Sequence, residues 1–165
     1  MRAIPTRDTI LPSSRGGAAR RRSHAPLRRS VAALAAVPLF DGSSKKHLRR
    51  LAREADVVEF GPGRPIVAEG QAGEAMYVIL TGTARVERAG RKVGALIPGD
   101  FFGELSALDA GPRTASVVPD TAVEVLRLFR HTVYKLIEEE PGLAMALLEG
   151  LARRLRQVQP GTPVP

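Results

Sequence analysis

The middle of the chain, between residues 56 and 128, consists of short apolar runs separated by turns that contain glycine. A turn follows roughly every ten residues. About seven or eight short strands with this spacing are typical of a sandwich, a jelly roll or a small barrel. The expected strands are residues 57–60, 65–68, 76–80, 84–87, 93–97, 115–118 and 123–128.

Helical patterns flank this region on both sides. Before it, an apolar stretch from Ser30 ends at Pro38, and two serines after Gly42 offer N-caps for a second helix that runs to about Ala55. Small and apolar residues recur on that helix at three- and four-residue spacing, with basic side chains on the other face, as in an amphipathic surface helix. Its basic side chains are Lys45, Lys46, Arg49, Arg50 and Arg53.

After the strands, residues 132–140 predict one helix, and Pro141 fits the first turn of the next. Apolar residues predict a single stripe along this last helix, at Leu143, Leu147, Leu148, Leu151, Leu155 and Val158. The expected fold class is mainly β with flanking helices. We expect an eight-stranded jelly-roll barrel, also called a double-stranded β-helix, with N-terminal helices and C-terminal lid helices.

The basic charge of the chain is concentrated at its N-terminus. The formal net charge is +8, yet residues 1–30 carry eight arginines against one aspartate, which leaves residues 31–165 with 17 basic and 16 acidic side chains. The sequence therefore predicts a basic, disordered tail over residues 1–29, one domain over residues 30–159 and a disordered C-terminus over residues 160–165.

Composition restricts the function further. Cysteine is absent, so we expect a reducing, cytoplasmic environment and no thiolate metal site. No apolar run approaches the length of a membrane span, and no compact export signal opens the chain. The sequence has no nucleophile elbow, P-loop or dinucleotide fingerprint, and its histidines are not paired on strands beside a carboxylate. We therefore expect no enzymatic activity, no metal and no cofactor.

One segment carries residues suited to binding a phosphorylated sugar. Glu104 and Arg113 stand nine residues apart, around the apolar turn of residues 101–108. A helix starting at Gly103 would aim free backbone N–H groups outward, and the Arg113 guanidinium could bind the same anion in a bidentate fork. Glu104 could accept a hydrogen bond from a ribose hydroxyl. A buried Glu104–Arg113 ion pair that caps a turn is the structural alternative.

This segment, residues 101–115, resembles the phosphate-binding cassette of the cyclic nucleotide-binding domain family, and we call it the cassette segment. The resemblance extends to residues 37–40, 69–79 and 81–82, and covers about residues 30–159. It implies that Glu104 accepts from the ribose 2′-hydroxyl and that Arg113 neutralises the phosphate. The implied ligand-binding residues are Gly103, Glu104, Leu105, Ser106, Arg113, Thr114 and Ala115.

The resemblance implies a cyclic nucleotide receptor, with cAMP as the first ligand and cGMP as the second. The hydroxyl of Thr114 permits either base, and we expect the base near Val78 or Val86, with the last helix as a lid. Three arginines of that helix are candidates for contact with the base: Arg153, Arg154 and Arg156.

The expected signal is a ligand-induced repositioning of the C-terminal helices, read by an unidentified effector protein. The family's transcription factors continue into a helix-turn-helix domain, whereas five residues follow position 160 here, so we expect no sequence-specific DNA binding. Two alternatives stay open. The domain could be a ligand-free structural or protein-interaction module, or residues 1–29 could bind nucleic acid or anionic surfaces without specificity.

Overall fold

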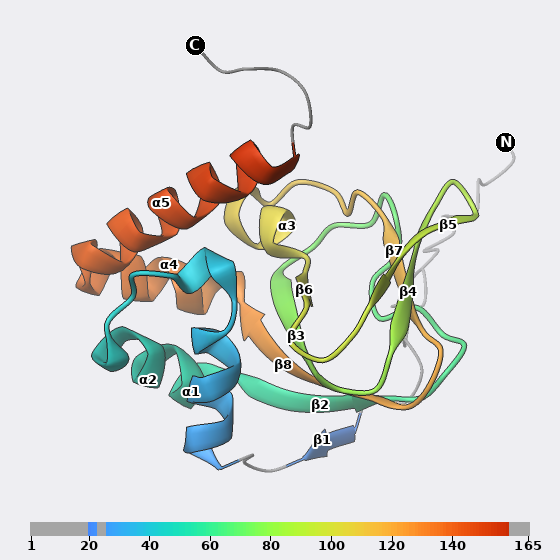
Figure 1. The fold of residues 1–165 in the computed structure, drawn as a ribbon, viewed down its shortest axis with the longest axis horizontal. Coiled ribbons are helices and arrows are strands. Elements are labelled where there is room, and N and C mark those ends of the chain that lie inside the picture. Colours follow the sequence, from blue (N-terminus) through green and yellow to red (C-terminus); the bar gives the residue numbers. More distant parts are fainter. Residues whose placement is uncertain (1–19, 23–25, 159–165) are drawn as a thin grey trace, which may run out of the picture.

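A computed structural model describes residues 20–22 and 26–158 (Figure 1). Its strands form a five-stranded sheet in the order β1-β2-β8-β3-β6 and a three-stranded sheet in the order β5-β4-β7. The strands are β1 (Arg20–Arg22), β2 (Asp56–Phe60), β3 (Ala75–Thr81), β4 (Ala84–Arg88), β5 (Arg91–Leu96), β6 (Phe101–Phe102), β7 (Ser116–Pro119) and β8 (Val123–Phe129). The helices are α1 (Leu27–Ala35), the 3-10 helix η1 (Pro38–Phe40), α2 (Lys45–Glu54), α3 (Glu104–Asp109), α4 (Arg130–Glu139) and α5 (Pro141–Val158).

The predicted fold class, a mainly β jelly roll with flanking helices, is confirmed. Figure 1 shows α1, α2, α4 and α5 gathered on one side of the five-stranded sheet, with the three-stranded sheet on the other. The helices pack on one face of this sheet, and its other face shares a core with β4 and β7.

Both faces of the five-stranded sheet are buried, and this explains the continuous apolar run of β3. Val78 on β3 packs with Leu126 of β8 into a core shared with α2, α4 and α5. The neighbouring Ile79 packs with Val125 into a second core that faces the three-stranded sheet. Because successive side chains on a strand point to opposite faces, a strand between two cores needs apolar residues at almost every position.

The prediction of a strand at residues 65–68 is wrong. This segment makes one isolated bridge, between Val67 and Val117, flanked by a bond from the Ile66 N–H to the Val117 carbonyl at 2.8 Å. Pro65 has no N–H to donate, and a turn at Gly70 follows at once, which leaves too few residues for a ladder. The short strand β6, which pairs with β3, was not expected from the sequence.

The N-terminal part of the domain differs from the sequence prediction. Arg20–Arg22 forms an antiparallel strand along β2, and α1 begins at Leu27 rather than at residue 30. The prediction of disordered termini thus covers a strand and the start of α1. Its remaining positions, residues 1–19, 23–25 and 160–165, lie outside the described part of the chain.

Helix α5 buries only part of its expected apolar stripe. Leu143 and Leu147 are buried, whereas Leu148 is 60% exposed and Leu155 is 65% exposed. A side chain added at Gly150 would overlap the backbone of Leu39, so α5 lies directly against η1 on that face. This close approach selects the face that holds residues 143, 147 and 150, and Leu148 and Leu155 lie off it.

Candidate ligand-binding site

The cassette segment begins with a sharp turn that only glycine suits. Gly103 precedes α3 with φ of 79°, in the left-handed region. A Cβ at this position would overlap Nη1 of Arg113 and lie 2.9 Å from the carbonyl oxygen of Ala75. Glycine therefore provides both the backbone conformation and the room for the arginine.

The Arg113 side chain is buried beside this turn, with 7% of its surface exposed. Its Nη1 donates to the Gly103 carbonyl at 3.1 Å, and its guanidinium lies 5.8 Å from the ring centroid of Tyr77. Burial lowers the pKa of the Arg113 guanidinium, while the nearby Tyr77 and Glu104 act in the opposite direction. A cation taken out of water beside a carbonyl and a ring is suited to receive an anion.

The loop before β3 fixes the backbone of Arg113. The Arg113 N–H donates to the Gln71 carbonyl at 2.8 Å, and the Gly70 N–H donates to the Arg113 carbonyl at 2.8 Å. An isolated bridge between Ala72 and Pro112 joins the same two segments. Residues about forty positions apart in the sequence thus set the place of one guanidinium.

Gly73 belongs to this arrangement, and the sequence did not single it out. A Cβ at Gly73 would overlap the Arg113 guanidinium and the Cβ of Ser106. The sequence signal is weak, because Gly73 is one of several glycines between residues 61 and 82. Its need for the smallest side chain follows only from the position of Arg113.

One cavity brings most of the predicted site residues together. Glu104 and Ser106 line it and are 4% and 3% exposed. Leu105 belongs to α3, and its side chain lies outside the described part of the structure. The predicted residues that line this cavity are Gly103, Glu104, Ser106, Arg113, Thr114 and Ala115.

The remainder of this cavity is apolar, with one further cation. Val86 lines it, as expected for a residue near the base, whereas Val78 packs into the core under the helices. Arg88 also lines the cavity and donates from Nε to the Thr114 carbonyl at 3.2 Å. The sequence missed Arg88, since it lies at the end of β4 among other charged residues. The apolar lining residues are Val67, Val86, Leu96, Phe101, Phe102 and Val117.

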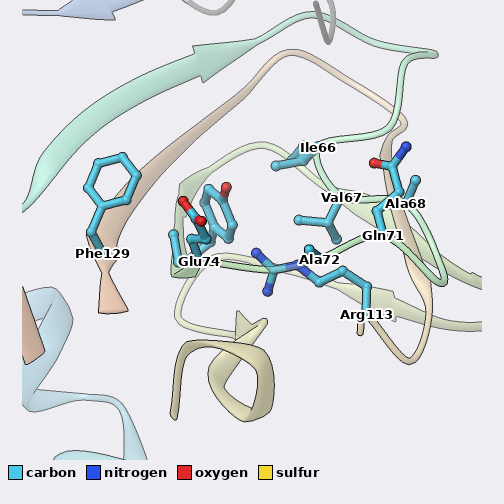
Figure 2. Close-up of a pocket in the computed structure, with 10 residues that line it drawn as sticks. Ile66, Val67, Ala68, Gln71, Ala72, Glu74, Arg113 and Phe129 are labelled. Atoms are coloured by element: carbon cyan, nitrogen blue, oxygen red, sulfur yellow. The ribbon is translucent and has the colours of Figure 1, made fainter. Parts of the chain in front are cut away.

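A second cavity shares Val67 and Arg113 with the first and is drawn in Figure 2. Figure 2 shows the Arg113 side chain at its edge, Glu74 within it and Phe129 at the far end. Tyr77 also lines this cavity, and burial raises the pKa of its phenol, an effect that Arg113 and Arg127 reduce. The first cavity is the better candidate site because it holds Glu104 and the residues that follow Arg113.

The C-terminal helices do not cover the candidate site in this structure. The described residues of α4 and α5 contribute no side chain to the lining of the first cavity. Arg153 instead donates to the Asp41 carbonyl at 2.9 Å, and Arg156 is exposed. The Arg154 side chain lies outside the described part.

A contact between α4 and α3 links the helices to the cassette segment. The Tyr134 hydroxyl on α4 donates to the Leu108 carbonyl on α3. Leu108 in turn packs against the core under the helices. In the described part of the chain, no helix is long and apolar enough to cross a membrane.

The chain is similar to a known protein family and to characterised regulators. The family model of the cyclic nucleotide-binding domain matches residues 57–140. The CRP-like cAMP-activated global transcriptional regulator of Mycobacterium tuberculosis is 34% identical over 129 residues, which cover 75% of this chain and 58% of the regulator. The chain therefore spans less than two thirds of that relative's length.

Two solved structures share the fold. The crystal structure of the Thermus thermophilus catabolite activator protein is similar with a TM-score of 0.63 and 36% identity, over 73% of this chain and 59% of that one. The N-terminal domain of a transcriptional regulator from Streptomyces coelicolor is similar with a TM-score of 0.70 and 28% identity, over 79% of this chain and 99% of that one.

Proposed function

The chain belongs to the cyclic nucleotide-binding domain family, and from this premise we propose that the cavity around Glu104 and Arg113 binds a cyclic nucleotide. The first candidate ligand is cAMP, in line with the cAMP-activated relative, and the second is cGMP. The buried guanidinium of Arg113, which lines this cavity together with Glu104 and Ser106, is the observation that carries the proposal, because a cyclic phosphate would pair with this buried cation.

Seven residues of the cassette segment have proposed roles. Glu104 accepts a hydrogen bond from the ribose 2′-hydroxyl, and the backbone N–H groups of Gly103, Leu105 and Ser106 face the ribose and phosphate. Arg113 neutralises the phosphate with help from Thr114 and Ala115.

The apolar end of the cavity would hold the purine. Val86 and the aromatic side chain of Phe101 offer the faces that a base packs against. Thr114 lines the same cavity, and its hydroxyl is the group proposed to bond to the polar edge of either purine.

We propose that the protein acts as a stand-alone receptor, without enzymatic activity, in the cytoplasm. Occupancy of the cassette segment would alter α3, and the Tyr134–Leu108 contact would pass that change to α4 and α5. An effector protein of unknown identity would read the new position of the helices.

Titration calorimetry with cAMP and with cGMP tests this function. Saturable binding of one ligand to the wild-type protein is expected, together with a rise in melting temperature. Arg113→Ala should weaken binding by about 2–5 kcal/mol, since it removes the charged partner of a buried phosphate. Arg64→Ala, at an exposed loop position, is the matched control and should bind like the wild type.

The competing function is a structural or protein-interaction module that needs no nucleotide. If millimolar cAMP and cGMP produce no heat of binding and no rise in melting temperature, the result supports that module. Normal affinity in Arg113→Ala would instead place the nucleotide in another cavity.

A further inference from the structure

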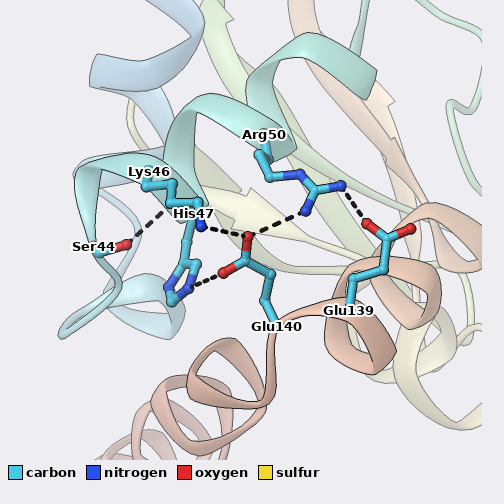
Figure 3. A network of polar contacts seen from close by, with 6 residues as sticks. All are labelled: Ser44, Lys46, His47, Arg50, Glu139 and Glu140. Carbon is cyan, nitrogen blue, oxygen red and sulfur yellow. Dashed lines mark hydrogen bonds and ion pairs between the residues drawn. The ribbon is translucent and has the colours of Figure 1, made fainter.

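Glu140, the residue between α4 and α5, binds cationic side chains from α2 (Figure 3). His47 Nε2 lies 2.8 Å from Oε2 of Glu140, and Arg50 Nη1 lies 3.1 Å from Oε1. Lys46 Nζ lies 3.4 Å from the same Oε1, and Arg50 also pairs with Glu139. Two helices that are about ninety residues apart in the sequence are joined by one carboxylate.

The His47–Glu140 pair at the centre of this network is built into the packing, whereas the side chains of Lys46, Arg50 and Glu139 are 75%, 36% and 39% exposed. The side chains of His47 and Glu140 are only 15% and 13% exposed. A Cβ added at Gly142, in the first turn of α5, would lie 3.4 Å from the His47 ring, so the ring sits directly against that turn. A pair buried to this extent is screened less by solvent than an isolated surface pair.

Glu140 occupies the joint at which one helix ends and the next begins. Its backbone is not helical, with φ of −135° and ψ of 81°, while its N–H still donates to the Leu136 carbonyl at 2.8 Å. Pro141 then starts α5 without a backbone N–H. A change in angle between α4 and α5 must pass through this residue, and α2 holds it in place.

The joint is also connected to the candidate site. Helix α4 contacts α3 through Tyr134 in its middle and contacts α2 through Glu139 and Glu140 at its end. In the arrangement so fixed, the described residues of α4 and α5 leave the cavity around Arg113 uncovered.

We propose that the network of Lys46, His47 and Arg50 with Glu139 and Glu140 is a latch that holds α4 and α5 off the nucleotide cavity and so limits affinity. This inference rests on the proposed function. If the ligand is bound best when the helices close over it, the apparent dissociation constant equals the intrinsic one divided by the fraction of closed molecules. A latch that stabilises the uncovered arrangement lowers that fraction, and breaking the latch raises it.

The test compares Glu140→Gln with Glu138→Gln in the full chain. Glu138 lies two residues away on α4 with an exposed side chain, so its substitution removes the same charge without touching the network. We expect Glu140→Gln to bind cAMP about three- to tenfold more tightly than wild type and Glu138→Gln to match wild type. Arg50→Gln should tighten binding in the same direction, and the double variant should add little, because both changes break one network.

Tighter binding separates a latch from a purely structural contact, since damage to the fold would weaken binding. Unchanged or weaker binding in Glu140→Gln and Arg50→Gln, with melting curves that remain cooperative, overturns the proposal.

Amide hydrogen exchange of the ligand-free proteins gives a readout that needs no nucleotide. Residues 139–146 should exchange faster in Glu140→Gln than in wild type or Glu138→Gln, and equal rates would overturn the latch. If the wild-type protein binds neither cyclic nucleotide, the proposed function fails, and the exchange rates still decide whether the joint is held by α2.

Discussion

At the scale of single residues, the position of one guanidinium depends on glycines from two distant segments. Gly103 and Gly73 both leave the space that Arg113 occupies, and neither tolerates a Cβ without movement of that side chain. The sequence predicts Gly103 as a site residue because it precedes the helix within the cassette segment. Gly73 became visible only when the loop before β3 was seen to pair with residues 112 and 113.

Gly73→Ala should therefore impair the candidate site. The added methyl group displaces the Arg113 guanidinium, and we expect at least about a tenfold loss in cAMP affinity, measured by calorimetry. Gly61→Ala is the matched control, because no atom lies within 4 Å of a Cβ there. Equal affinity in the two variants would mean that Arg113 can move without cost to binding.

At the scale of elements, the helices join the sheet through apolar packing and are oriented by polar contacts. The apolar face of α5 at Leu143 and Leu147 fixes which side of the helix is buried. The carboxylate of Glu140, just before α5, pairs with His47 and Arg50 of α2. Arg50 is the main cause of a lowered pKa at Glu140, with His47 and Lys46 adding to it.

The lowered pKa of Glu140 predicts a pH dependence of stability. A carboxyl group whose folded pKa lies below its ordinary value of 4.5 stabilises the fold above that pH, and the contribution is lost as the pH falls through the folded pKa. Wild type should melt at a higher temperature than Glu140→Gln at pH 7, and the difference should shrink as the pH falls below 4.5 and through the folded pKa. A difference that is constant from pH 7 to pH 3 would contradict this assignment.

At the scale of the whole molecule, the charge is divided between the domain and its N-terminal segment. The folded region is nearly neutral, with 17 basic and 16 acidic side chains over residues 31–165. Residues 20–22 of the basic segment pair with β2 through their backbone.

Deleting residues 1–19 should weaken binding to double-stranded DNA without changing cyclic nucleotide affinity. The deletion removes three arginines, Arg2, Arg7 and Arg15. If all three contact phosphates, the slope of log K against log salt should fall in magnitude by about 2.7. Salt titrations of both proteins measure this slope, and identical slopes would exclude a role for residues 1–19 in polyanion binding.

The family and the fold class could be read from the sequence because they depend on local spacing. Glu104 and Arg113 are nine residues apart around one turn, so a short segment brings them to one cavity wherever it lies in the fold. The match of residues 57–140 to the cyclic nucleotide-binding domain confirms the family that these residues indicated. The ligand-binding roles of the individual residues stay predictions.

Contacts between distant segments could not be read in this way. The sequence alone determined the strand and helix periods and the composition of the cassette segment, because both arise from neighbouring residues. Only the tertiary structure decided that Gly73 borders Arg113 and that α5 buries some of its apolar residues and exposes others. It also decided that His47 contacts Glu140, which lies 93 positions away in the sequence. Those contacts depend on how whole elements pack, since the free energy of packing is shared among many residues and no short stretch encodes it.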